Sequence, residues 1–224
     1  ILRAGAMDSH DDRIREAARL ISARCPRLVK SCYWAGTSVI SIEELHHRVS
    51  FDLDFHTRSA LADTRPLLVE MQRGFPGAFE LVESPDEFGS GFSGLLTLDG
   101  GERIPIQVLS NYDDVRESDL VPSRLVPAMA LARYLADKVQ CLVERAEARD
   151  LVDVAAVLKS RPDLVPRARR FVAEQDAMLL VERLTAWNDL SIEADLQAYP
   201  EVDPALASRT RDMLLEWLRE EAES

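Results

Sequence analysis

The clearest pattern in the sequence is a strict alternation of apolar and polar residues over positions 48–56, which read RVSFDLDFH. The apolar positions are Val49, Phe51, Leu53 and Phe55, and the polar positions that follow them are Ser50, Asp52, Asp54 and His56. A period of two is typical of a half-buried β-strand, with one row of side chains in the core and the other facing outward. The pattern therefore predicts a strand that presents two carboxylates on one face.

The neighbouring patterns predict an α/β (α+β) fold with a small mixed sheet. Positions 31–40 predict a short strand that runs into Gly36-Thr37-Ser38 and then a helix, and positions 60–73 predict a further helix. Positions 78–84, 91–98 and 103–110 predict three more strands, with a hairpin turn at 99–101. Pro105 places the last of these strands at an edge or a bulge, because proline cannot donate to a strand ladder.

From Pro127 onward the composition shifts to Ala, Leu, Arg and Glu, and we expect no further strand. Helices are predicted at about 127–145, 149–158, 164–185, 190–198 and 204–222. The chain is therefore expected to have two parts, residues 7–126 with all the strands and residues 127–224 with helices alone.

The two carboxylates at positions 52 and 54 indicate a metal site. On a strand that rises about 3.3 Å per residue, their carbons would lie about 6–7 Å apart, and like charges held so close repel. A bound Mg²⁺ or Mn²⁺ would resolve the conflict, since one or two carboxylates commonly hold such a cation together with substrate phosphates. The alternative is a solvated edge strand whose acids deter aggregation.

The triplet Gly36-Thr37-Ser38 lies where a predicted strand passes into a helix. Glycine there would let the backbone approach a ligand, and the start of a helix offers free N–H groups to a phosphate. Such a triplet is also typical of an ordinary helix cap. Its place immediately before the DxD strand is what makes it a candidate phosphate loop.

Positions 135–158 hold a second set of candidates. Lys138 lies one predicted helix upstream of Asp150 and Asp153, which share a helix face because they are three residues apart. The lysine could hold a triphosphate as a point charge, and the acid could position the lysine or an attacking hydroxyl. The alternative is a solvated lysine and two acids that the helix dipole favours near a helix start.

Composition limits the classes of protein. No apolar run approaches the ~18 residues of a membrane span, so we expect no membrane association. Cys25, Cys32 and Cys141 lack CxxC spacing and indicate reduced thiols in a cytoplasmic protein. The formal net charge of −12 argues against non-specific nucleic-acid binding, so RNA would need a local cationic strip. The candidates for such a strip are Arg161, Arg167, Arg169 and Arg170, with Arg145 and Arg149 nearer the second set of candidates.

Two blocks of sequence resemble the AbiEii/AbiGii toxin family of nucleotidyltransferases, which includes the mycobacterial MenT toxins. Residues 35–55, AGTSVISIEELHHRVSFDLDF, are similar to the family pattern of a Gly-Gly/Ser-Thr loop, a short helix, His-Arg, and then S-x-D-x-D-F. Residues 136–158, ADKVQCLVERAEARDLVDVAAVL, resemble the pattern K-x-x-A-L-x-x-R followed by R-D-x-x-D-L. The blocks agree with the family in both order and spacing.

The resemblance implies a nucleotidyltransferase fold, with residues 7–126 as catalytic core and a helical part, residues 127–224, that contributes Lys138 and Asp153 to the site. Asp52 and Asp54 match the metal ligands, Lys138 matches the family lysine, and Asp153 matches the acid of R-D-x-x-D, with Asp150 in support. The nucleotide-binding residues would be Gly36, Thr37, Ser38, Arg48 and Lys138. Arg48 could reach a phosphate or pair with a carboxylate.

The resemblance also implies partners. The substrate would be an NTP, the acceptor a tRNA 3′ end whose modification blocks translation, and the protein partner an antitoxin. Two alternatives are an enzyme of the same fold that modifies a small molecule, as aminoglycoside nucleotidyltransferases do, and a non-catalytic protein of this fold. Incubation with labelled NTPs and total RNA would separate the two enzymes, and absence of NTP or metal binding would favour the third.

Several positions depart from the family pattern or leave two interpretations open. Ala35 replaces the usual first glycine, and Gln107 stands where many nucleotidyltransferases place a third carboxylate. His46 and His47 are expected in a surface turn. Ser50 is either a small residue that leaves room for substrate, or a site where an added phosphoryl or nucleotidyl group would switch activity off.

Overall fold

The computed structural model describes residues 4–145 and 147–223, and the chain divides into two compact units. The first unit contains the chain up to Glu44 together with Val49–Ala130, and the second contains Leu45–Arg48 and the chain from Leu131 onward. The segment Leu45–Arg48 therefore leaves the first unit, belongs to the second, and returns just before the carboxylates of the DxD motif.

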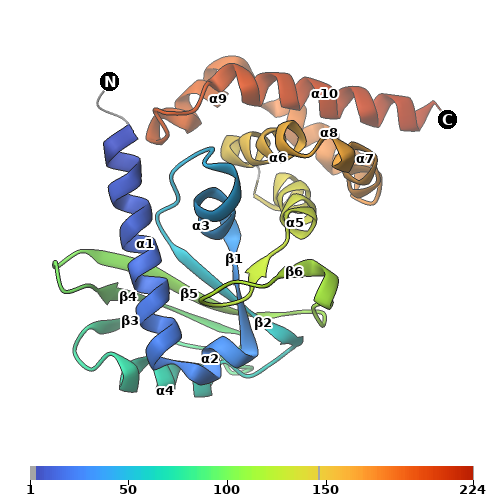
Figure 1. Cartoon of the computed structure of the whole chain (residues 1–224). Helices are drawn as coiled ribbons and strands as arrows, with labels where there is room; N and C mark the ends of the chain where they lie inside the picture. The colour runs from blue at the N-terminus through green and yellow to red at the C-terminus, as the bar shows by residue number, and fades with distance from the viewer. Residues whose placement is uncertain (1–3, 146, 224) are drawn as a thin grey trace. The chain divides into compact units, whose positions relative to one another are not determined.

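The first unit is built on a mixed sheet, as the sequence predicts, but with seven strands in place of the five expected (Figure 1). Its strands are β1 (Cys32–Ala35), β2 (Leu53–Ala60), β3 (Phe79–Glu83), β4 (Gly91–Thr97), β5 (Arg103–Asn111), β6 (Leu120–Val121) and β7 (Ala128–Met129). The spatial order is β3-β4-β5-β2-β1-β7-β6. The pairs β2–β5 and β1–β7 are parallel and the other pairs are antiparallel. The carboxylate-bearing strand β2 is thus an interior strand between β1 and β5.

Helices cover one face of this sheet. They are α1 (Ala4–Arg24), α2 (Pro26–Ser31), α3 (Gly36–Ile40) and α4 (Arg65–Gly74), with a π-helical turn at Ser41–Leu45 and a 3₁₀ turn at Glu117–Asp119. Figure 1 shows α1 lying across the strands, and α1 contacts both β5 and α4. It buries Ile14, Ala17 and Ile21, whose spacing matches the helical repeat. In β5, Ile104, Ile106 and Val108 are buried, whereas the residues that alternate with them, such as Pro105 and Gln107, lie on the opposite face and are more exposed.

Some local predictions for the first unit are wrong. The helix expected from position 60 begins at Arg65, and Leu61 is 74% exposed with a left-handed backbone (φ 49°). Pro105 does not place β5 at an edge of the sheet, because β5 pairs with β4 on one side and β2 on the other. Pro105 pairs with Leu95 of β4, and pairing with β2 begins one residue later, at Ile106. A proline is tolerated there because the ladder on that side begins only after it. The expectations of no strand after Pro127 and of a helix from about position 127 are wrong, because β7 lies at Ala128–Met129 and α5 begins only at Leu131. Neither β7 nor β6 was predicted, since two-residue strands carry no periodic signal.

The second unit is helical. Its helices are α5 (Leu131–Glu144), α6 (Ala148–Ser160), α7 (Val165–Ala173), α8 (Ala177–Ala186), α9 (Asp189–Asp195) and α10 (Pro204–Ala222), with 3₁₀ turns at Pro162–Leu164 and Leu196–Ala198. α6 packs against both α5 and α10. The single helix predicted at 164–185 is two helices, because Asp176 caps α8 by accepting a hydrogen bond from the Leu179 N–H at 3.0 Å. Within the described chain, no helix is long and apolar enough to cross a membrane.

Candidate functional site

The first group of candidate residues lies where β1 ends, in the first unit. Gly36 follows β1 with a left-handed backbone (φ 74°), and a Cβ atom added there would lie 2.2 Å from Asp54 Oδ2. Such an approach is possible only for glycine, because any side chain would collide with the carboxylate. The first role of Gly36 in the structure is therefore to let the Asp54 carboxylate lie against the backbone of the loop.

The two residues after Gly36 are enclosed within the first unit. Thr37 is 6% exposed and Ser38 is fully buried. The Ser38 hydroxyl accepts a hydrogen bond from Trp34 Nε1 at 2.9 Å. Ser38 thus holds the end of β1 to the start of α3, and direct nucleotide contact by Thr37 or Ser38 stays a prediction.

The two carboxylates lie at the beginning of β2. Asp54 pairs in register with Ala35 of β1 on one side and with Gln107 of β5 on the other. Asp52 directly precedes the strand, and its Oδ1 accepts a hydrogen bond from the Ser50 hydroxyl at 3.0 Å. Both acids line one cavity of about 330 Å³. The carboxylates are therefore half-buried and reachable, as a site for ligands requires.

The predicted strand over 48–56 is correct only from Leu53 onward. Phe51, expected in the core, is 49% exposed, and Ser50, expected on the outward row, is 5% exposed. The reason is that Arg48, 3% exposed, is bound by Asp153 within the second unit, so the chain cannot continue the strand pairing backward from Leu53. The expected proximity of Ser50 to Asp52 nevertheless holds.

Whether these acids suit a divalent cation can be judged from their surroundings. No group of three or more His, Cys, Asp or Glu side chains in the described part of the chain could hold a metal. Two adjacent carboxylates still fit Mg²⁺ or Mn²⁺, because such ions commonly take one or two protein carboxylates and complete their shell with water and substrate phosphates. The position next to Asp54 on β5 is Gln107, so a third carboxylate is absent from that register position.

The second group of candidates forms a buried charge cluster around Asp153 in the second unit. Arg48 donates to both oxygens of Asp153, from Nε at 2.7 Å and from Nη2 at 2.8 Å. On the same carboxylate, His47 Nε2 lies 2.8 Å from Oδ1 and Lys138 Nζ lies 2.9 Å from Oδ2. Asp153 is fully buried and Lys138 is 6% exposed. The interpretation of Lys138 as a solvated lysine is therefore wrong.

Mutual attraction keeps this cluster charged. Burial alone would raise the pKa of Asp153, but the positive charges of Lys138 and Arg48 outweigh it and hold that pKa well below its ordinary value. Burial would lower the pKa of Lys138, yet the Asp153 carboxylate outweighs this and the pKa of Lys138 is raised. A fully enclosed acid that binds three side chains is arranged to position them, which supports positioning of the lysine as the role of Asp153.

Asp150 binds the same lysine from the preceding turn of α6. Its Oδ1 lies 3.0 Å from Lys138 Nζ, and Arg145 binds both of its oxygens, at 2.9 Å from Nε and 2.7 Å from Nη2. Two tyrosine rings complete the surroundings: the Lys138 ammonium lies 5.3 Å from the ring centre of Tyr134, and the Arg48 guanidinium lies 5.2 Å from that of Tyr199. These are cation–π distances, so the rings help to fix both cations.

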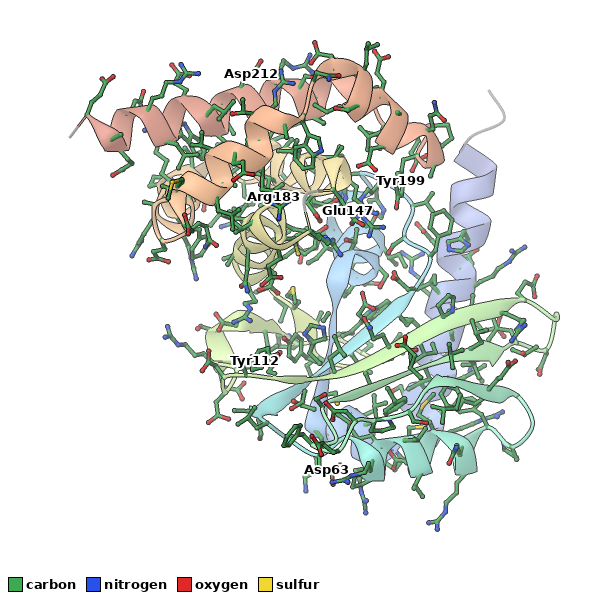
Figure 2. The ribbon with its side chains drawn as sticks, turned by 180° about the vertical axis from the view of Figure 1, so that it is seen from behind. Asp63, Tyr112, Glu147, Arg183, Tyr199 and Asp212 are labelled. Atoms are coloured by element: carbon green, nitrogen blue, oxygen red, sulfur yellow. The ribbon has the colours of Figure 1, made fainter. Side chains whose placement is uncertain are left out.

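Tyr199 is also tied to the start of α6. Arg149 donates to the Tyr199 hydroxyl at 2.9 Å and to Glu147 at 2.7 Å. Figure 2 shows Tyr199 and Glu147 side by side in this region. Sequence reasoning missed Tyr199, for which no local signal exists, because it follows the 3₁₀ turn Leu196–Ala198, 50 residues after Arg149.

The prediction of a surface turn is wrong for His47, whose side chain is 8% exposed and bound to Asp153. His46 is exposed and has a left-handed backbone (φ 49°). Arg48 pairs with a carboxylate, one of its two predicted roles. The signal that could have identified His47 and Arg48 is the His-Arg pair of the family pattern, because both side chains here contact the Asp153 carboxylate.

Most of the arginines proposed as an RNA strip are neutralised by the chain itself. Arg161 pairs with Asp163 at 2.7 Å and Arg169 with Glu220 at 2.6 Å. Arg145 and Arg149 bind the acids described above. Exposed cations available for a phosphate are therefore fewer in this strip than the sequence suggests.

Comparisons with known proteins agree with this architecture. Residues 36–222 match the family model described as nucleotidyl transferase AbiEii toxin, Type IV TA system. A putative nucleotidyltransferase from H. pylori is similar in structure, with a TM-score of 0.59, 17% identity, and coverage of 97% of this chain and 96% of that one. JHP933 from Helicobacter pylori follows with a TM-score of 0.51, 14% identity, and coverage of 97% and 95%. These two likenesses confirm the expected fold.

A third similar structure is MenT4, a nucleotidyltransferase toxin from Mycobacterium tuberculosis H37Rv, with a TM-score of 0.47, 18% identity, and coverage of 98% of this chain and 90% of that one. No curated protein sequence matches the chain. The family model spans both the loop at Gly36 and the helices to α10. The chain therefore belongs to the AbiEii family of nucleotidyltransferase toxins.

Proposed function

We propose that this toxin transfers a nucleoside monophosphate from an NTP to the 3′-terminal hydroxyl of an RNA, with tRNA as the acceptor, and so blocks translation. The observation that carries the proposal is the arrangement at the start of β2, where Asp54 lies between Gly36 and Gln107 and Asp52 precedes it. Paired carboxylates beside a glycine loop suit chemistry in which a polyphosphate is held and one phosphoryl group is attacked.

The transfer is a single displacement. The acceptor hydroxyl oxygen forms a bond to the α-phosphorus of the NTP, the bond from that phosphorus to the bridging oxygen breaks, and pyrophosphate leaves. The hydroxyl proton passes to water. Asp52 and Asp54 would hold a Mg²⁺ or Mn²⁺ ion, which when bound supplies positive charge for the phosphoryl oxygens. Ser50 orients Asp52 through its 3.0 Å hydrogen bond, and Gly36 lets Asp54 take its position.

Lys138 is proposed to hold the triphosphate of the same NTP. Asp153 and Asp150 fix its ammonium group from two sides, at 2.9 and 3.0 Å, which keeps it charged and limits its rotamers. A lysine restrained in this way would act as a preorganised point charge. Joint action of this cluster with Asp52 and Asp54 is part of the proposal, and so is nucleotide binding by Arg48, Thr37 and Ser38.

A cognate antitoxin and a modification at Ser50 are proposed as the restraint on this activity. The Ser50 hydroxyl lies against Asp52 and the residue is 5% exposed, so an added phosphoryl or nucleotidyl group would place charge and bulk directly beside a metal-binding carboxylate. Mass spectrometry of protein produced together with its neighbour-encoded partner tests this. An unmodified Ser50 in inactive protein would remove the mechanism.

A second candidate acceptor, a small cationic molecule such as an aminoglycoside, is favoured by the charges of the chain. The net charge is −12, and four of the six candidate RNA-binding arginines pair with the chain's own acids. The experiment that decides uses NTPs labelled in either the α- or the γ-phosphate, with total tRNA and with kanamycin as acceptors. The proposal predicts α-label on tRNA and γ-label in pyrophosphate only. Label on kanamycin with none on tRNA would establish the second candidate instead.

A further inference from the structure

The cavity beside the two carboxylates lies on the face of the sheet that carries Asp54 and Gln107, within the first unit. Its floor crosses three strands, because Asp54 of β2, Gln107 of β5 and Ser93 of β4 are consecutive partners in register. Within the described chain the Gln107 side chain makes no hydrogen bond, so its amide is available to a ligand. This polar row leads from the catalytic pair to the edge of the sheet.

The remaining wall of the cavity is apolar and uncharged. Val82 of the edge strand β3 is 58% exposed, and Leu95 and Pro105 are partners in the β4–β5 ladder. Among the residues that the structure describes, no lysine, arginine or histidine lines the cavity, and the charged ones that do are Asp52 and Asp54. Such a lining disfavours phosphate groups and suits the flat face of a nucleobase, which stacks on apolar side chains.

The position of the cavity relative to Gly36 indicates which substrate enters it. Asp54 has β1 and the Gly36 loop on one side and β5 with Gln107 on the other. In an in-line displacement the attacking oxygen and the leaving pyrophosphate lie on opposite sides of the phosphorus. If the pyrophosphate leaves on the side of the Gly36 loop, the acceptor hydroxyl must arrive from the side of β5, which is the cavity.

We propose that this cavity is the acceptor subsite and takes the unpaired 3′-terminal nucleoside of the acceptor RNA. The terminal base lies against Val82, Leu95 and Pro105, and the terminal ribose reaches Gln107 beside Asp54. The inference rests on the proposed function and deepens it. Because a base inside the cavity cannot also be paired in a duplex, an RNA with a single-stranded 3′ end is the substrate class.

Gln107 is the positioning residue of this subsite. Its side-chain carbonyl accepts a hydrogen bond from the attacking hydroxyl and orients the oxygen toward the α-phosphorus. An amide cannot take up the proton, so the proton passes to water, as in the transfer step above. Gln107 therefore raises the rate by placing the hydroxyl, and it should act mainly on kcat.

The first test compares Val82→Asp with the matched control Val69→Asp, which changes a 42% exposed valine on α4 that does not line the cavity. We expect Val82→Asp to raise the KM for tRNA about tenfold or more, since a lost stacking contact and a new negative charge both weaken RNA binding. The KM for NTP should not change. An unchanged KM for tRNA, or an equal rise in the control, would overturn the assignment.

Two further measurements complete the test. Gln107→Leu should lower kcat for RNA about tenfold without changing the KM for NTP. Gln107→Asn should have a kcat between those of Gln107→Leu and the wild type. A Gln107→Leu enzyme with the wild-type kcat refutes the positioning role of Gln107. For the wild type, a hairpin RNA with a four-nucleotide 3′ overhang should accept label and the same hairpin with a blunt end should not. Equal labelling overturns the subsite alone. Absence of label on any RNA overturns this inference together with the proposed function.

Discussion

Replacement of Asp153 by asparagine should be among the most destabilising single substitutions in the second unit. The carboxylate is fully buried and binds Arg48, His47 and Lys138 at 2.7–2.9 Å. Lys138 keeps its contact to Asp150, whereas Arg48, 3% exposed, loses a two-pronged ion pair. Removal of one partner from a buried pair typically costs about 3–5 kcal/mol. Against a total stability of about 5–15 kcal/mol, this is a large fraction.

A matched control is available in the same unit. Asp163 pairs with Arg161 at 2.7 Å, the same distance as Arg48 to Asp153, but both side chains are at least half exposed. Exposed pairs contribute about 0–1 kcal/mol, so Asp163→Asn should change the free energy of unfolding little. Urea unfolding followed by far-UV circular dichroism and tryptophan fluorescence measures both variants. If Asp153→Asn lowered the free energy of unfolding no more than Asp163→Asn, the buried ion pairs of Asp153 would not stabilise the second unit more than an exposed pair does, which would refute the prediction.

The remaining predictions concern the loop, the pH range and the serine. Gly36→Ala should lower kcat at least about tenfold, because the added Cβ displaces the Asp54 carboxylate; a fully active variant would contradict the close approach. Because the pKa of Asp153 is lowered in the folded state, its contribution to stability is present above the unfolded pKa of about 3.9 and is lost as pH falls from there through the folded pKa. Because the pKa of Lys138 is raised, its contribution is present below the unfolded pKa of about 10.4 and is lost only as pH rises through the folded pKa. Acid unfolding curves of wild type and Asp153→Asn should therefore converge below about pH 4, and parallel curves would refute this. In a transfer assay Ser50→Asp should be inactive while Ser50→Ala keeps most activity, and an active Ser50→Asp leaves the switch without a mechanism.

Much of the sheet could be predicted because its strands alternate in burial as their sequences do. In β2, Leu53 and Phe55 are buried while Asp54 and His56 are more exposed, so the period of two in the sequence matches the period of two in burial. The loop at Gly36 could also be predicted, since glycine between a strand and a helix has few structural alternatives. Two-residue strands such as β7 give no such signal, and tertiary pairing alone creates them.

The contacts that the candidate site residues make could not be predicted from the sequence. The alternation over 48–56 is present in the sequence, yet Arg48 and Ser50 are buried, because an ion pair with an acid about a hundred residues away outweighs the local pattern. Sequence spacing could not show that Asp153 binds Arg48 and His47 together with Lys138. Such long-range pairing depends on the packed helices α5 and α6, which no local pattern encodes.

The proposed function requires the carboxylates of Asp52 and Asp54 for nucleotidyl transfer, and an assay of variants at these two positions tests that requirement. Wild type, Asp52→Asn, Asp54→Asn and the control Asp99→Asn, which changes an exposed acid of the 99–101 turn, are incubated with α-labelled NTP, Mg²⁺ and tRNA. We expect labelled tRNA from wild type and control, and a transfer rate lower by about a thousandfold or more in each site variant, with an unchanged circular dichroism spectrum. A site variant that transfers within about tenfold of the wild-type rate would contradict that requirement.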